Sequence, residues 1–260
     1  MRSADRHALK RVLPLKNERA ARDRQRRFWI DGVRMACRAV EHHAQVELVV
    51  RSKPLLTSSA GRHAVRALRE RGAELLEVSP ELFRSLQVAP RACGVGLVAR
   101  QRWRELRSLE EGTWLVLERL RSPGNLGTLL RAAEASGARG LVCVGGQLDP
   151  FHPGVVRASM GSHFNLDFVR CGAGSLSRQT RRLGARLLGT CPSATLRWDQ
   201  ASYAEPLFIA LGEEGEGMSR SLRASCTELV SIPVLGGADS LNVGVAGGLV
   251  LYEALRQRIP

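Results

Sequence analysis

The sequence contains no closely spaced cysteine pair. Its six cysteines stand singly along the chain, at Cys37, Cys93, Cys143, Cys171, Cys191 and Cys226. Zinc ribbons and redox motifs need a C-x-x-C pair, so this spacing argues against both. The six histidines show no metal-ligand spacing either, and we expect no metal site. The cysteines are interpreted as reduced residues that pack in the core.

Long apolar stretches are also missing. No charged segment followed by an apolar one opens the chain, and no run approaches the roughly 18 apolar residues of a membrane span. We therefore expect a cytoplasmic protein with no membrane partner.

Two nucleotide-binding signatures are absent as well. The glycine-rich segments match neither G-x-G-x-x-G nor a P-loop, because no lysine follows the glycines of residues 209–219. This disfavours a dinucleotide-dependent oxidoreductase. No internal repeat is evident, and a composition of 44% hydrophobic and 25% charged residues is that of a folded globular chain.

Positive charge is what the sequence has in excess. The formal net charge is +14 at pH 7, and residues 1–38 hold twelve Lys or Arg against four Asp or Glu, a local excess of 12 − 4 = +8. Such a field attracts polyanions, so nucleic acid is the first partner to consider. Two alternatives stay open, namely a solvated basic tail and an arginine bias of a GC-rich genome.

Apolar periodicity divides the 260 residues into four parts. A basic arm over residues 1–27 precedes alternating strand and helix patterns over residues 28–100, which predict a small α/β domain. Residues 101–112 are charged and are interpreted as a linker. Nearly continuous apolar strands alternate with helices over residues 113–260, which indicates a mostly parallel sheet covered on both faces. The elements expected there are strands 114–117, 141–144, 186–189, 207–211 and 229–233 and helices 125–136, 176–183 and 241–258.

Three segments of this second domain follow strands, where ligands of open α/β sheets gather. Residues 119–131 place Asn125 at a helix start and Arg131 six residues later. Residues 209–219 carry three glycines and three carboxylates. Residues 231–253 form a glycine-rich loop and a glycine-rich helix. Taken singly, each has a plain structural interpretation: Asn125 as an N-cap, Arg131 as a surface arginine, an acidic turn, and tight helix packing.

Together and in this order, the three segments resemble the signature motifs of the SPOUT superfamily, in detail those of the TrmH (SpoU) family of ribose 2′-O-methyltransferases. The matching stretches are Asn125-x-Gly127-x-x-x-Arg131, residues 211–219 with Glu214, residues 232–243, and Leu251-Tyr252-Glu253, with weaker likeness at residues 149–150 and 156–162. Residues 28–33 and 93–95 are similar to the small ribosomal-protein-like RNA-binding domain of many members. Two positions depart from the pattern, since Glu213 stands where Asn is frequent and Gly244 where a small polar residue is common.

The resemblance implies a trefoil-knotted methyltransferase domain, a topology that sequence physics alone would not suggest. It further implies S-adenosyl-L-methionine as cofactor, a homodimer, and RNA as substrate, rRNA more than tRNA. The cofactor-binding residues implied are Thr190, Leu211, Gly212, Gly217, Ile232 and Leu241. The catalytic residues implied are Arg131, Asn125, Glu214, Ser240 and Asn242.

The family assigns the arginine a general-base role, but a guanidinium has a pKa above about 12 and accepts protons poorly. We instead interpret Arg131 as a cation that holds phosphate and stabilises a developing alkoxide. The basic arm is expected to contact RNA phosphates. Two alternatives remain, a non-catalytic RNA-binding protein on the same fold and an RNA base methyltransferase of another SPOUT branch.

Overall fold

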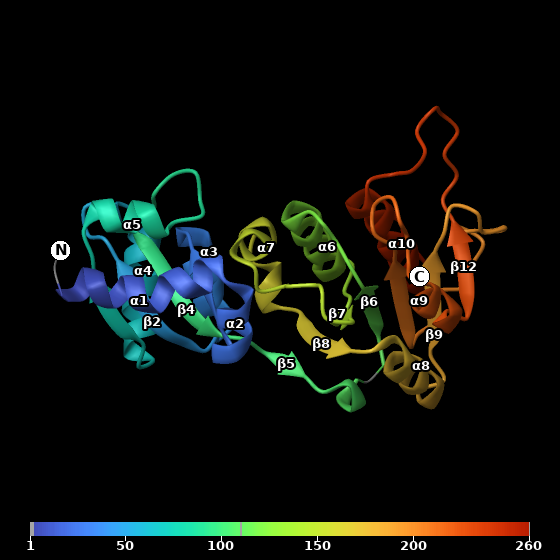
Figure 1. Ribbon diagram of the computed structural model, residues 1–260, viewed down its shortest axis with the longest axis horizontal. Coiled ribbons are helices and arrows are strands. Elements are labelled where there is room, and N and C mark those ends of the chain that lie inside the picture. The colour runs from blue at the N-terminus through green and yellow to red at the C-terminus, as the bar shows by residue number, and fades with distance from the viewer. Residues whose placement is uncertain (1–2, 110, 260) are drawn as a thin grey trace. The chain divides into compact units, whose positions relative to one another are not determined.

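The structure is a computed structural model that describes residues 3–109 and 111–259 (Figure 1). Residues 1, 2, 110 and 260, which belong to the expected arm, linker and second domain, lie outside the described residues. The chain separates into two compact units. The first comprises Met1–Gln101 and Asp149–Asn165, and the second comprises Arg102–Leu148 and Leu166–Pro260.

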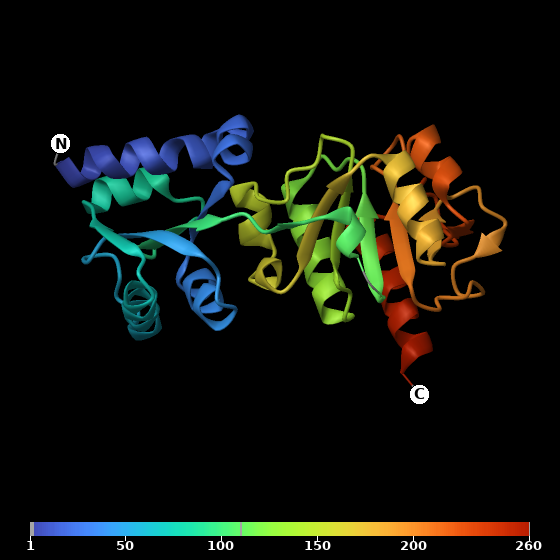
Figure 2. The same cartoon turned by 90° about the horizontal axis from the view of Figure 1, so that it is seen from below.

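The first unit is built on a four-stranded sheet in the order β1-β4-β2-β3. Its strands are β1 (Arg27–Asp31), β2 (Val46–Arg51), β3 (Glu74–Glu77) and β4 (Val95–Arg100). Its first five helices are α1 (Ser3–Asn17), α2 (Arg19–Gln25), α3 (Val33–Glu41), α4 (Ser59–Glu70) and α5 (Pro80–Leu86). Strands β2 and β3 are parallel, whereas β4 runs antiparallel to β1 and β2. Figure 2 shows α1 and α5 on one face of this sheet and α3 and α4 on the other.

Within the basic arm expected over residues 1–27, Ser3–Asn17 and Arg19–Gln25 form two helices that belong to this unit. Ala8, Val12 and Leu15 of α1 follow a helical i, i+4, i+7 spacing and are buried in one core with Trp29 and Phe83. Sequence reasoning missed the helix because only this narrow apolar stripe interrupts a strongly basic segment. The solvated-tail alternative therefore does not hold for residues 3–27, and deleting the arm would open this core.

Segment Asp149–Asn165, expected within the second domain, packs against β1 of the first unit. Its helix α7 (Pro153–Ala158) contacts β1, and Phe151 stacks edge-on against Phe28 with ring centroids 5.0 Å apart. Asp149 Oδ2 also receives Arg22 Nη2 at 2.6 Å, with the Arg22 side chain only 2% exposed. This ion pair and the aromatic contacts tie the segment to the first unit, which its short length and mixed polarity did not reveal.

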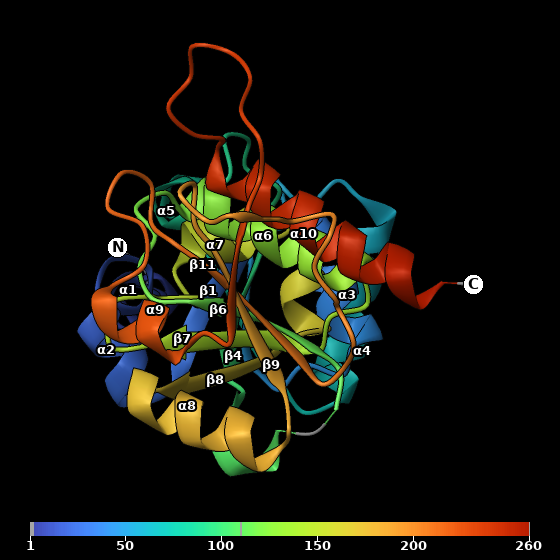
Figure 3. The same cartoon turned by 90° about the vertical axis from the view of Figure 1, so that its right-hand side faces the viewer.

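The second unit contains an eight-stranded sheet in the order β10-β12-β9-β11-β6-β7-β8-β5. The strands are β5 (Trp103–Arg104), β6 (Thr113–Leu117), β7 (Gly140–Val144), β8 (Asp167–Cys171), β9 (Arg186–Thr190), β10 (Leu196–Arg197), β11 (Leu207–Leu211) and β12 (Glu228–Ser231). Every neighbouring pair is parallel. Helices α6 (Pro123–Ala135) and α10 (Val243–Arg258) cover one face, and α8 (Ala173–Arg182) and α9 (Arg220–Ser225) cover the other (Figure 3). The predicted parallel sheet with helices on both faces is confirmed, while the trefoil knot stays a prediction.

Within the expected linker over residues 101–112, Trp103–Arg104 form strand β5 of this second sheet. Strand β5 pairs with β8, where the Arg170 guanidinium lies 4.4 Å from the Trp103 ring centroid, and Leu109 is buried in the core. The sequence did not predict the two edge strands of this sheet, β5 and β10, because charged residues alternate with apolar ones there. A strand at the edge of a sheet needs no continuous apolar run.

Within the described residues, no helix combines the length and the apolar composition that crossing a membrane requires.

Buried His163 is expected to make the first unit sensitive to acid. Burial lowers the pKa of His163 to about 3, and its ring lies 5.0 Å from that of Phe151. The unfolded chain takes up a proton at this histidine below about pH 6.5, whereas the folded chain does so only near pH 3. The free energy of unfolding should therefore fall as the pH falls through this window.

The variant His163→Phe removes the titrating group and keeps an aromatic ring in place. Between pH 7 and pH 5 it should lose about 2 kcal/mol less stability than the parent protein. Urea denaturation at the two pH values measures this difference, and His63→Gln, at an exposed position, serves as control. An equal loss in the parent and in His163→Phe would contradict the assignment.

Candidate active site

The strand order of the second unit reverses between β6 and β11. From β6 the chain proceeds outward through β7 and β8 on one side, then returns to β9, β11 and β12 on the other. Ligands of open α/β sheets bind outside the carboxyl ends of the strands at such a switch point. Asn125 lies in the first turn of α6, which follows β6, and Glu214 lies in the loop after β11, so the sheet itself brings two of the predicted residues to this place.

A chain of side-chain hydrogen bonds joins the three predicted segments. Asn242 Nδ2 donates to Asn125 Oδ1 at 3.2 Å, and Asn125 Nδ2 donates to Glu214 Oε1. Asn125 is free for this role because Ser122, not Asn125, caps α6, with Ser122 Oγ accepting from the Asn125 backbone N–H at 3.3 Å. The N-cap interpretation of Asn125 is therefore wrong.

Asn242 serves two elements at once. Its Oδ1 accepts the Gly244 backbone N–H at 2.8 Å and so caps α10, while its Nδ2 reaches Asn125. The start of α10 is thereby fixed relative to the start of α6.

Glu214 has one carboxylate oxygen without a partner. Oε1 accepts from Asn125, whereas Oε2 is buried and meets no hydrogen-bond donor in the described part of the chain. Buried polar atoms are nearly always hydrogen-bonded. The unpaired Glu214 Oε2 at the carboxyl edge of the sheet therefore indicates a place for a ligand hydroxyl or amine.

The loop after β11 folds tightly back on itself. Glu213 and Gly217 exchange backbone hydrogen bonds of 3.1 and 3.0 Å, and Gly217 has a φ of +69°. A Cβ at Gly212 would lie 2.6 Å from the Gly217 backbone. Glycine at both positions lets the loop that carries Glu214 close on itself.

Two arginines from the loop after β6 hold this acidic loop. Arg121 Nε lies 2.6 Å from Glu213 Oε1, and Arg119 pairs with Glu213 at 3.4 Å and with Glu216 at 3.1 Å. The Glu213 side chain is only 7% exposed. The departure at Glu213 thus has a structural use, because its carboxylate connects the loop that precedes α6 with the loop that carries Glu214. Sequence reasoning missed Arg119 and Arg121, although opposite charge on two loops at one sheet edge was an available signal.

Most residues implied for cofactor binding lie at the same edge of the sheet. Thr190 is paired with Val230 near the end of β12, and Gly189 is paired with Ala210, which brings Thr190 level with Leu211. Ile232 directly follows β12, and Leu241 directly precedes Asn242. Their roles stay predictions.

Arg131 and Ser240 stand outside the hydrogen-bonded chain. Both side chains are exposed, and within residues 3–109 and 111–259 neither makes a hydrogen bond or an ion pair. Ser240 lies in the long loop between β12 and α10, which projects from the unit in Figures 1 and 3 and leaves Leu235 98% exposed.

The glycines of α10 differ in how closely neighbouring residues pack against them. A Cβ at Gly247 would lie 2.3 Å from Leu129 Cδ2 and 2.6 Å from Leu211 Cδ1, so α10 packs closely on α6 and β11 there. A Cβ at Gly244 would meet Thr128 at 3.2 Å, whereas one at Gly248 would meet nothing within 4 Å. The tight-packing interpretation holds for Gly247 and only loosely for Gly244.

Replacing Gly247 tests this packing. Gly247→Ala should destabilise the protein by about 1–3 kcal/mol, because the added methyl overlaps two buried leucines. Gly174→Ala, at an open position of α8, is the matched control and should be neutral or slightly stabilising. Thermal or urea denaturation measures both, and equal effects at the two positions would refute the packing argument.

Two family models match the chain. The SpoU rRNA Methylase family matches residues 112–252, and the MRM3-like substrate binding domain matches residues 7–92. A 23S rRNA uridine 2′-O-methyltransferase of Streptomyces viridochromogenes is 31% identical over 255 residues, covering 94% of this chain and 88% of that protein. A 23S rRNA guanosine 2′-O-methyltransferase of Vibrio parahaemolyticus is 37% identical over 148 residues, covering 56% of this chain and 59% of that protein.

Solved structures are similar over nearly the whole chain. The SpoU methyltransferase AviRb of Streptomyces viridochromogenes in complex with AdoMet has a TM-score of 0.87 at 31% identity, covering 100% of this chain and 99% of that one. The AdoMet-bound rRNA methyltransferase of Sinorhizobium meliloti has a TM-score of 0.86 at 29% identity, covering 97% and 95%.

Proposed function

The chain belongs to the SpoU rRNA methylase family, and from this premise we propose that Asn125, Glu214 and Asn242 position an rRNA ribose whose 2′-hydroxyl receives a methyl group. The protein is an RNA 2′-O-ribose methyltransferase that uses S-adenosyl-L-methionine. The hydrogen-bonded chain from Asn242 through Asn125 to Glu214, which ends in an unpartnered carboxylate oxygen, is the observation that carries the assignment of the site.

The cofactor is assigned to the carboxyl ends of β9, β11 and β12, where ligands of open α/β sheets gather. Gly212 and Gly217 let the loop after β11 fold back on itself at this edge of the sheet without side chains in the way. The residues proposed to hold the cofactor are Thr190, Leu211, Gly212, Gly217, Ile232 and Leu241. When bound, the cofactor supplies an electrophilic methyl group.

The protein's own contribution is alignment and charge stabilisation. Glu214 Oε2 accepts a hydrogen bond from a ribose hydroxyl, and Asn125 fixes the orientation of that carboxylate through its hydrogen bond to Oε1. Among the described residues Arg131 has no partner to release, so its guanidinium is free to hold the adjacent phosphate and to stabilise the oxygen as its proton passes to solvent water. Ser240 is proposed to complete the ribose contacts from the β12–α10 loop.

A ribosomal RNA substrate is favoured over tRNA. The relative that matches 94% of the chain is named for 23S rRNA, whereas a solved structure named for tRNA methylation covers 56% of the chain. The cytoplasmic location expected from the sequence remains part of this proposal.

Replacement of Arg131 separates a catalytic role from a structural one. Arg131→Ala should lower the rate of methyl transfer by about two orders of magnitude or more, with folding and cofactor affinity unchanged. Arg131→Lys should recover only part of the rate, because an ammonium lacks the planar two-donor fork. Transfer of labelled methyl to unmodified 23S rRNA measures the rate, and near-parental rates in both variants would show that Arg131 is a plain surface residue.

A homodimer through α10 is a further part of the proposal. Val245 and Tyr252 are 53% and 51% exposed and, with Gly248 and Leu249, line one side of α10 beside a hollow of about 460 Å³. The i, i+3, i+4 and i+7 spacing forms an apolar stripe that a second copy of α10 is able to cover.

The variant Tyr252→Glu should shift the protein from dimer to monomer at micromolar concentration, since it buries a charge in that stripe. Sedimentation measures the mass of both forms. Leu13→Glu, at an exposed apolar position of α1, is the matched control and should leave the mass unchanged. A monomeric parent protein would reject the interface.

A further inference from the structure

The first unit carries a basic pocket that the methyl-transfer site does not use. It has a volume of about 550 Å³ and is lined by Arg51, Arg62, Val65, Arg66, Arg69 and Glu70. Arg51 ends β2, and the other five residues lie on α4. Four guanidinium groups thus face one hollow that contains a single carboxylate.

The four arginines differ in how they are held. Arg62 Nη1 donates to the Thr57 carbonyl at 2.7 Å, and Arg51 is paired with Glu77. The side chains of Arg66 and Arg69 are exposed and make neither a hydrogen bond nor an ion pair with any residue that the structure describes. The pocket therefore has two anchored cations at its wall and two cations available to a ligand.

The three arginines on α4 destabilise that helix, because their like charges lie close together. Arg62 and Arg66 are four residues apart and Arg66 and Arg69 three apart, so the charges follow one another at about 6 Å and about 4.5 Å along the axis. Like charges at these spacings destabilise a helix by about 0.2–0.5 kcal/mol per pair. Glu70 stands four residues after Arg66 on α4 but forms no ion pair with Arg66 or Arg69 in the described part of the chain, so no salt bridge on this helix offsets the repulsion.

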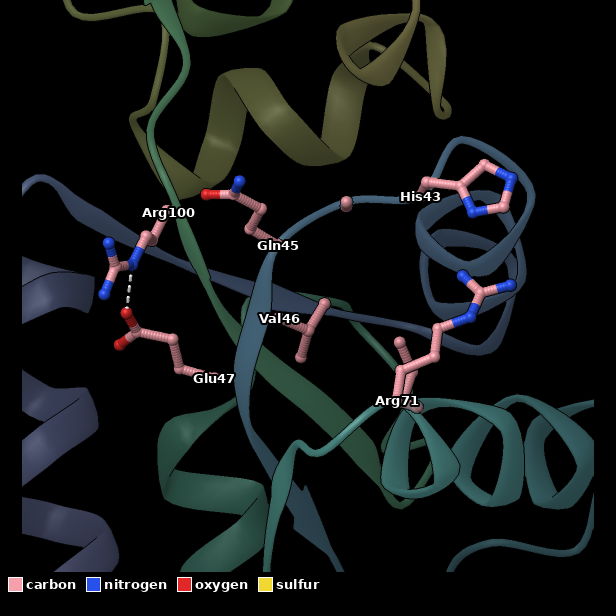
Figure 4. A pocket seen from close by; sticks show the side chains of 8 residues that line it. His43, Gln45, Val46, Glu47, Arg71 and Arg100 are labelled. Carbon is pink, nitrogen blue, oxygen red and sulfur yellow. Dashed lines mark hydrogen bonds and ion pairs between the residues drawn. The ribbon is translucent and has the colours of Figure 1, made fainter.

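A second pocket of the same unit provides a contrast. It has a volume of about 460 Å³ and is lined by His43, Ala44, Gln45, Val46, Glu47, Leu68, Arg71 and Arg100. Figure 4 shows Arg100 joined to Glu47 on one side of the opening and Arg71 with His43 on the other. Arg71 Nη1 also donates to the Val40 carbonyl at 2.7 Å. Both arginines there are engaged within the protein, unlike Arg66 and Arg69.

We propose that the α4 pocket binds the phosphodiester backbone of the rRNA substrate, through residues other than those that position the methylated ribose. The proposal rests on the proposed function, which supplies RNA as the polyanion. Arginine suits this partner because its planar fork donates two parallel hydrogen bonds to a phosphate. Contacts of this kind position a substrate without reading its sequence, so the pocket adds affinity and register, while the choice of nucleotide is made elsewhere.

The test removes the two available charges with Arg66→Gln and Arg69→Gln in one variant. Binding to an unmodified 23S rRNA transcript is measured across a salt series, together with cofactor binding and the rate of methyl transfer. Affinity should fall about tenfold or more near 0.1 M salt, and the slope of log affinity against log salt should become shallower by about 1.4 to 1.8 for two lost phosphate contacts. Cofactor affinity should not change, and the loss should appear in KM with kcat retained.

The matched control removes the same charge from the second unit, outside the basic arm. The side chains of Arg102 and of Arg181 on α8 are also exposed and make no hydrogen bond or ion pair with the described residues. Arg102→Gln with Arg181→Gln should leave the affinity within about twofold of the parent protein and the salt slope nearly unchanged. Equal losses in the two double variants would mean that only net charge counts, and would overturn the pocket.

The remaining outcomes separate this proposal from the proposed function. A parent protein that binds the transcript but never methylates it would refute the function, while a selective loss in the α4 variant would still support the pocket. A parent protein that methylates RNA, with an α4 variant of unchanged KM and salt slope, would overturn the pocket alone. Polyglutamate serves as a second probe, which stands for an acidic protein. If the α4 variant kept its RNA binding but lost binding to polyglutamate, the pocket would be assigned to an acidic protein and the RNA proposal would be overturned as well.

Discussion

The hydrogen bonds from Asn242 through Asn125 to Glu214 are the contacts on which the active-site geometry depends. They connect the start of α10, the start of α6 and the loop after β11, three segments that are far apart in sequence. Supporting contacts keep each member in place: Ser122 caps α6, Gly247 lets α10 approach α6, and Arg119 and Arg121 hold the acidic loop through Glu213. Each element thus serves to bring three polar side chains to one edge of a parallel sheet.

The second unit was predictable because its signals are local and strong. Strands β6 and β11 are nearly unbroken apolar runs, and Asn125 and Glu214 come soon after them, so the sheet brings these two residues together. Asn242 is placed by α10, whose first turn it caps. The first unit was harder. Helix α1 buries only Asp5, Ala8, Val12 and Leu15 of a basic segment, and segment Asp149–Asn165 attaches through Arg22 and Phe28, contacts between residues more than 100 positions apart that no local pattern encodes. Loop contacts such as Arg121 with Glu213 were missed for the same reason.

The excess of positive charge divides into three classes in the structure. Some arginines are structural, as Arg22 is in its buried pair with Asp149; some connect loops, as Arg119 and Arg121 do; and a few, among them Arg131, Arg66 and Arg69, have no partner in the described part of the chain. Only the last class is available to RNA without breaking a contact of the fold. The net charge of +14 therefore overestimates the positive charge that is available to bind the substrate. Whether each arginine is paired within the protein is a better indicator of which ones contact RNA.

The most direct test of the hydrogen-bonded site is a double-mutant cycle on methyl transfer. Asn242→Asp keeps the oxygen that caps α10 and removes the amide that donates to Asn125, while Asn125→Ala removes the centre of the chain. If the three residues act as one unit, the double variant should be no slower than the slower single variant. Losses in rate that multiply, as for independent residues, would contradict the account.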